Sequence, residues 1–200
     1  MSANPTTMKV ERMDPFIRLC IRLGVTPNML TLARLCAVPF VIYFYIPREL
    51  SLVSFFIFVG GWILDLYDGW LARVLELVTQ FGQFFDPVAD KIFFLTPLTM
   101  FFIMNLVLPV TYYSFVLVEL SLVAVRLLKV ANQVVHQTEK ADLGATNWGK
   151  HKSYVEQGCI ALLLLNSDTY WWVAMVNGIL IVALLLAFAS LISQLKRKYG

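Results

Sequence analysis

The sequence predicts an all-α integral membrane protein with six transmembrane helices, preceded by an amphipathic helix that lies at the membrane surface. Hydrophobic residues make up 59% of the 200 positions and charged residues only 14%, whereas a soluble domain carries about 25% charged residues. The apolar residues gather in several runs of the length that a helix needs to cross a bilayer, about 20 residues. We therefore expect a cytoplasmic N-terminal segment at residues 1–25 and one membrane domain at residues 26–200.

The N-terminal third of the chain is expected to form three helices. An apolar stripe, with arginines on the other sides, predicts a helix in the headgroup plane over residues 14–23. A Thr-Pro-Asn start signal opens the first span at residue 26, and that span ends near Ile46. A Pro-Arg-Glu turn follows, and the second span covers residues 50–73.

Polar connections separate the remaining four spans, which we expect at residues 82–108, 112–130, 154–165 and 170–195. Residues 132–152 form the longest polar stretch, and a Lys-Arg-Lys run follows the last span. An even number of spans puts both termini on one side of the membrane. The connections on that side hold most of the lysines and arginines, so the positive-inside rule predicts that both termini face the cytoplasm.

Four aspartates lie among apolar residues at the cytoplasmic ends of the second and third spans. They belong to the pattern D-x-x-D-G-x-x-A-R-x8-G-x3-D-x3-D, whose members are Asp65, Asp68, Gly69, Ala72, Arg73, Gly82, Asp86 and Asp90. At about 100° per residue, the first two aspartates share an arc of roughly 100° with the glycine and the alanine. The last two are one turn apart and also share a face. If the two helices pack side by side, all four carboxylates converge on one pocket.

Carboxylates placed in or near hydrocarbon need compensation, because each costs roughly 2.5–3.5 kcal/mol at the bilayer centre on insertion scales. Oxygen ligands of this kind select Mg²⁺, Mn²⁺ or Ca²⁺ rather than zinc. Two such cations can grip a pyrophosphate and stabilise a displacement at phosphorus. Because apolar helices continue below the cluster, the residues predict phosphoryl chemistry on a lipid pyrophosphate.

The eight-residue pattern resembles that of the CDP-alcohol phosphotransferases at every position and spacing. The resemblance implies transfer of a phosphatidyl or similar group from a CDP-linked donor to an alcohol, with release of CMP. It further implies a six-helix homodimer with two Mg²⁺ or Mn²⁺ ions and a cytoplasmic active site, in the inner membrane of a bacterium. The implied metal ligands are Asp65, Asp68, Asp86 and Asp90, with Asp90 also the general base on the acceptor hydroxyl. The implied donor-binding residues are Thr31, Asp65, Asp68, Gly69, Ala72, Arg73 and Gly82.

Further segments resemble the family members that use CDP-diacylglycerol as donor and glycerol 3-phosphate as acceptor. These segments are TPNMLTLARLCAVPF at 26–40, DPVADK at 86–91, Glu119 with Arg126, and GKHKS at 149–153. The implied acceptor-binding residues are Arg34, Arg126, Lys150 and Lys152. Val118 and Glu156 stand where those members usually have Arg and Gln, in the region that would hold an anionic acceptor. Phosphatidylglycerol, inositol phosphate and serine therefore remain alternative acceptors.

Other interpretations of the charged residues compete with this one. The aspartates could form a buried salt-bridge network in which Arg73 and Lys91 neutralise two of them. They could also line an ion transporter, although a transporter predicts acidic residues spread across the depth of the membrane. Glu119 is expected to pair with a nearby cation. Beyond the two substrates, the expected partners are membrane lipids and a second copy of the chain, and no nucleic acid.

Overall fold

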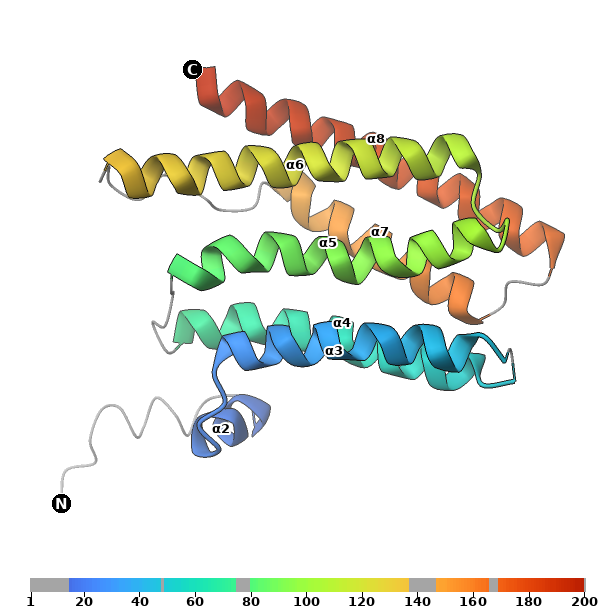
Figure 1. Cartoon of the computed structure of the whole chain (residues 1–200), viewed down its shortest axis with the longest axis horizontal. Helices are drawn as coiled ribbons and strands as arrows, with labels where there is room; N and C mark the ends of the chain where they lie inside the picture. Colours follow the sequence, from blue (N-terminus) through green and yellow to red (C-terminus); the bar gives the residue numbers. More distant parts are fainter. Residues whose placement is uncertain (1–14, 48, 75–79, 137–146, 166–168, 200) are drawn as a thin grey trace.

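The computed structural model describes residues 15–47, 49–74, 80–136, 147–165 and 169–199. These residues form seven α-helices and no strand, and six of the helices lie alongside one another as a bundle (Figure 1). The helices are α2 (Pro15–Arg22), α3 (Pro27–Tyr45), α4 (Ser51–Val74), α5 (Gln80–Ile103), α6 (Pro109–His136), α7 (Asn147–Leu165) and α8 (Tyr170–Tyr199).

The short helix α2 meets the bundle through a glycine turn. Gly24 has a φ of +67°, the left-handed conformation that costs glycine little. The Val25 amide donates to the Cys20 carbonyl and the Gly24 amide to the Ile21 carbonyl, so the helix ends in a Schellman motif. The chain then turns directly into α3, whose first residue is Pro27. The predicted helix over residues 14–23 is confirmed.

Within the described ranges, four helices contain segments that are long and apolar enough to cross a membrane: Pro27–Tyr45, Ser51–Asp68, Pro109–Leu128 and Tyr170–Gln194. The all-helical membrane class is thereby confirmed. Helices α5 and α7 were also expected to span, but each carries three charged residues in its first half, which places it outside this set. The six-span arrangement therefore stays a proposal.

The polar stretch predicted at residues 132–152 contains more helix than its composition indicated. Helix α6 continues to His136, and α7 already begins at Asn147. Hydropathy marks where a chain leaves hydrocarbon, whereas a helix can continue into the headgroup region and water with polar side chains. The helix ends therefore lie beyond the ends of the apolar runs.

An aromatic core holds α3, α4 and α5 together beside the predicted site. The rings of Phe58 and Phe93 stack with centroids 4.8 Å apart, and both side chains are fully buried. The Arg34 guanidinium, from α3, lies over the Phe93 ring, 5.5 Å from its centroid. At Gly61, a Cβ atom would come within 2.8 Å of the Phe93 ring, so the absence of a side chain allows this close approach.

Candidate active site

Helix α3 contributes two polar side chains that contact the first pair of aspartates. The Thr31 hydroxyl donates to Asp68 Oδ2 at 3.1 Å, with the Pro27 carbonyl as an alternative acceptor at 3.3 Å. The Arg34 guanidinium is 1% exposed and pairs with Asp65 Oδ1. Thr31, a predicted donor-site residue, thus contacts Asp68, and Arg34, which was expected at the acceptor, contacts Asp65. Both roles stay predictions.

The second pair of aspartates comes from the start of α5. Asp86 is exposed, and the Asp90 side chain is 20% exposed, with Oδ2 3.1 Å from the Lys91 ammonium. The electrostatic attraction of Arg34 reaches all four aspartates, and Asp65 is repelled by both Asp86 and Asp90. Helices α4 and α5 therefore bring the four carboxylates into one electrostatic neighbourhood.

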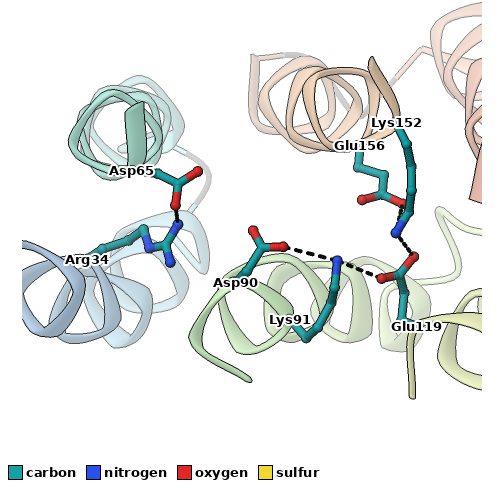
Figure 2. Close-up of polar contacts among 7 residues, drawn as sticks. All are labelled: Arg34, Asp65, Asp90, Lys91, Glu119, Lys152 and Glu156. Atoms are coloured by element: carbon teal, nitrogen blue, oxygen red, sulfur yellow. Dashed lines mark hydrogen bonds and ion pairs between the residues drawn. The ribbon is translucent and has the colours of Figure 1, made fainter. Parts of the chain in front are cut away.

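Beyond Asp90, a chain of buried ion pairs joins α5, α6 and α7 (Figure 2). Lys91 Nζ lies 2.6 Å from Glu119 Oε2, and Lys152 Nζ lies 2.5 Å from Glu119 Oε1. Lys152 also reaches Glu156 at 3.4 Å. Glu119 is fully buried, so its two cations balance a charge that would otherwise be costly in this position. The expectation that Glu119 pairs with a cation is confirmed.

The sequence offered Lys91 as a possible partner of the aspartates, and Lys91 does pair with Asp90. It linked neither Lys91 to Glu119 nor Glu156 to Lys152. Glu119 lies 28 positions after Lys91 and 33 before Lys152, so no local spacing links them. The signal available in the sequence was a charged residue on an otherwise apolar helix, which indicates that a partner exists but does not identify it. Its partners become visible only when the contacting faces of α5, α6 and α7 are known.

A small polar pocket lies against the same lysines. Its lining consists of Lys91, Leu122, Val123, Arg126, Lys152, Ser153 and Ser190. Its cavity volume, about 10 Å³, is the space that one water molecule needs. Three cationic side chains thus surround it, among them Arg126 and Lys152, which the sequence assigned to acceptor binding.

Lys91 also borders an apolar groove of about 710 Å³ along α3, α5 and α6. Apart from Lys91 and two threonines, its lining is aliphatic side chains and methionines, and it extends as far as Ile46 and Met104. Lys91 is therefore the residue at which the aspartates, the small pocket and the groove meet.

Several predicted site residues fall where the structure describes only the backbone. Gly69, Ala72 and Arg73 lie in α4, Gly82 in α5 and Lys150 in α7. Their surroundings lie outside the described part of the structure. Their roles therefore stay predictions.

The carboxylates suit a hard divalent cation by donor chemistry, since Mg²⁺ and Mn²⁺ prefer oxygen ligands. Among the described side chains, however, no three acidic, histidine or cysteine residues converge closely enough to hold one ion. Two of the carboxylates are held by cations instead, Asp65 by Arg34 and Asp90 by Lys91. The Arg34–Asp65 pair must open before Asp65 can turn toward a shared metal ion, whereas Asp90 contacts Lys91 through Oδ2 and keeps Oδ1 for a metal ion.

Comparison with known proteins adds to this geometry. Residues 24–189 match the family model described as CDP-alcohol phosphatidyltransferase. A CDP-diacylglycerol–glycerol-3-phosphate 3-phosphatidyltransferase of Haemophilus influenzae is 28% identical over 177 residues, which cover 87% of this chain and 93% of the relative. A protein of the same name from Pseudomonas fluorescens is 28% identical over 180 residues, 85% of this chain and 88% of the relative. One from Wigglesworthia glossinidia brevipalpis is 50% identical over 74 residues, 36% of this chain and 40% of the relative.

The matched residues include the four aspartates, the ion-pair chain and all of the lining of the small pocket except Ser190. The family model covers well over half of the chain, and two of these relatives align along most of it. The chain therefore belongs to the CDP-alcohol phosphatidyltransferase family and is a membrane-associated enzyme of that class.

Proposed function

We propose that this enzyme transfers the phosphatidyl group of CDP-diacylglycerol to glycerol 3-phosphate, with the aid of two divalent cations. The products are phosphatidylglycerophosphate and CMP. One observation carries the proposal: Asp90, the last of the four aspartates, pairs with Lys91, which lines a pocket together with Arg126 and Lys152. An acidic cluster that can hold cations thus lies next to a cationic pocket that can hold an anionic acceptor.

The donor side of the site is formed by α3, α4 and the start of α5. Asp65, Asp68, Asp86 and Asp90 are the proposed ligands of two Mg²⁺ or Mn²⁺ ions. When bound, these ions supply charge stabilisation to the diphosphate and to the departing CMP. Thr31, Gly69, Ala72, Arg73 and Gly82 are the proposed contacts of the CDP group. The buried Nε of Arg34 has no hydrogen-bond acceptor among the described residues, which fits a site that receives a phosphate oxygen.

Asp90 is the proposed general base. It takes the proton of the acceptor hydroxyl while that oxygen forms a bond to the phosphorus that bears diacylglycerol. The bond between this phosphorus and the CMP oxygen breaks. The Asp90 side chain is partly exposed, so a substrate hydroxyl can reach its carboxylate, as a general base requires.

The acceptor side is the small pocket lined by α5, α6, α7 and α8, which has the space of one water molecule and must widen to admit a phosphate. Its three cations suit a phosphate, because charged donors form the stronger hydrogen bonds to anions. Arg126 and Lys152 keep the role that the sequence gave them, and Lys150 is proposed to lie nearby. Arg34 is not among the residues that line this pocket.

The two departures from the closest family pattern bear on the identity of the acceptor. Val118 is 1% exposed and packs with Leu122 and Ala187, so it lies in the core between α6 and α8. Glu156 is 1% exposed and faces Lys152. Valine in place of arginine carries no positive charge, and Glu156 adds negative charge beside Lys152, so both departures weaken the preference for an anionic acceptor. Neither residue lines the pocket, and its three cations, Lys91, Arg126 and Lys152, are what favours a phosphorylated acceptor over serine.

The apolar groove beside Lys91 supports a lipid donor. It begins next to Asp90 and continues along the apolar part of the bundle. A hydrocarbon tail is the occupant that matches this lining, with the diphosphate left at the aspartates. The aliphatic lining offers no counterpart for a soluble nucleotide sugar or alcohol.

The remaining features of the proposal concern the membrane. We propose that α3 to α8 are six spans, that both termini and the active site face the cytoplasm of a bacterial inner membrane, and that the enzyme is a homodimer. The positive-inside distribution of charge supports the orientation. Residues 1–25 are then a cytoplasmic segment with its surface helix, and residues 26–200 the catalytic domain.

A direct assay tests the reaction and the acceptor together. Purified enzyme is mixed with labelled CDP-diacylglycerol and with glycerol 3-phosphate, phosphatidylglycerol, inositol phosphate or serine, each with Mg²⁺, with Mn²⁺ or with EDTA. We expect CMP release and a labelled lipid product with glycerol 3-phosphate and a metal ion, and none with EDTA. Turnover with serine alone, or turnover that persists in EDTA, would contradict the proposal.

A further inference from the structure

Lys91 is shared between the proposed general base and the proposed acceptor pocket. Its ammonium lies 3.1 Å from Asp90 Oδ2 and 2.6 Å from Glu119 Oε2, and the same side chain lines the pocket with Arg126 and Lys152. Only 9% of the side chain is exposed. Few other ligands are therefore available to this ammonium.

Glu119 fixes the position of Lys91 at this boundary. Its two carboxylate oxygens hold Lys91 and Lys152, which approach from α5 and α7. An ammonium has three N–H donors, so Lys91 can keep its contact with Glu119 while another donor changes its acceptor. The acceptor that can be exchanged is Asp90, because Asp90 is partly exposed and makes the longer contact.

We propose that Lys91 couples occupancy of the acceptor pocket to the freeing of Asp90. This inference rests on the proposed function. An entering phosphate draws Lys91 toward the pocket, because a dianion offers it more negative charge than one carboxylate. Asp90 Oδ2 then loses the Lys91 ammonium and is free to take the proton of the hydroxyl that attacks phosphorus, while Oδ1 would remain the metal ligand. While the pocket is empty, the Lys91–Asp90 pair keeps the base from activating water, which protects the donor from hydrolysis.

In this arrangement Glu119 is a positioning residue: it holds Lys91 between its two partners and contacts no substrate atom. Lys152 shares Glu119 and the pocket with Lys91, but no ion pair links it to Asp90. Lys152 is therefore the matched comparison for Lys91. Both lysines should contribute to phosphate binding, and only Lys91 should control the base.

A substrate divided into two pieces tests the coupling in the wild-type enzyme. Glycerol supplies the hydroxyl, and inorganic phosphite supplies a dianion for the pocket. We expect phosphite to raise the rate of glycerol-dependent CMP release by about tenfold, because it replaces Asp90 as a charged partner of Lys91. The control contains chloride at equal ionic strength. No activation by phosphite, or inhibition, in an enzyme that uses glycerol 3-phosphate would overturn the coupling while leaving the proposed function intact. An enzyme that transfers nothing to glycerol 3-phosphate overturns both.

Two lysine variants test whether Lys91, and not Lys152, couples the acceptor pocket to Asp90. In Lys91→Gln, we expect phosphite activation to be lost and CMP release to exceed phosphatidyl transfer, since water then reaches an unrestrained Asp90. In Lys152→Gln, we expect a raised KM for glycerol 3-phosphate, with one CMP still released for each phosphatidyl group transferred. Equal behaviour of the two variants would refute the special role of Lys91. Should either variant fail to fold, the wild-type phosphite experiment decides alone.

Binding to the metal-free enzyme gives a second readout that does not depend on turnover. In EDTA, we expect phosphite to raise the Tm of the wild-type protein in detergent, and to raise that of Lys91→Gln less. A Tm that does not respond to phosphite in the wild-type protein would count against an anion site at Lys91.

Discussion

At the scale of single residues, Asp90 must be both protected and reachable. The Lys91 ammonium compensates its charge, and part of the side chain remains open to a substrate. Asp65 has a comparable cation in Arg34, and Asp68 has the Thr31 hydroxyl. Each of these contacts stabilises a carboxylate in the absence of substrates. The Asp65 and Asp90 carboxylates are also partly exposed, so a metal ion or a hydroxyl group can reach them.

The role of Asp90 is tested by Asp90→Asn. The amide keeps the size of the side chain but cannot take a proton. We expect turnover to fall by about 10²–10⁴-fold, the usual contribution of a general base, with an unchanged elution profile in detergent. The matched control is Glu49→Gln, the same change at an exposed carboxylate in the turn between α3 and α4. Near-normal turnover of Asp90→Asn would exclude Asp90 as the base.

At the scale of elements, the site depends on how closely α4 approaches α3 and α5. Gly61 faces the Phe93 ring and the Arg34 side chain, and Arg34 leads directly to Asp65. The Phe93 ring is stacked on Phe58 and fully buried, so it has little room to move. The face of α4 that carries Gly61 thus sets how closely α4 approaches α5, the other helix that carries aspartates.

A pair of glycine variants tests this packing. In Gly61→Ala, the new methyl group forces the Phe93 ring aside, and overpacking of this kind costs about 1–3 kcal/mol. We expect a clear fall in Tm in detergent. Gly60→Ala is the control, because a Cβ at that position meets nothing within 4 Å and alanine favours the helix. Equal Tm values for the two variants would show that α4 does not pack on Phe93 in this way.

At the scale of the whole molecule, hydropathy and the aspartate pattern predicted much of the arrangement. Each of the seven described helices overlaps a predicted one, because apolar runs and Pro or Gly signals at their ends act locally, although α5 ends earlier and α6 and α7 extend further than predicted. The requirement that four carboxylates share one site predicted that α4 and α5 pack side by side, whereas in the structure α3 and α7 pack against both and the Phe58–Phe93 stack joins them. The pairings of Lys91, Glu119 and Lys152 could not be predicted, because they depend on which faces of three helices meet. The pairing of Arg34 with Asp65 could not be predicted for the same reason, because it depends on which faces of α3 and α4 meet.

The central claim is that the four aspartates hold two divalent cations at a phosphatidyl-transfer site. Crystals grown with Mn²⁺ and CDP, measured at a wavelength where manganese scatters anomalously, test this claim most directly. We predict two anomalous peaks among Asp65, Asp68, Asp86 and Asp90, with Arg34 turned away from Asp65. A map without such peaks, in which Asp65 remains paired with Arg34, would contradict the account.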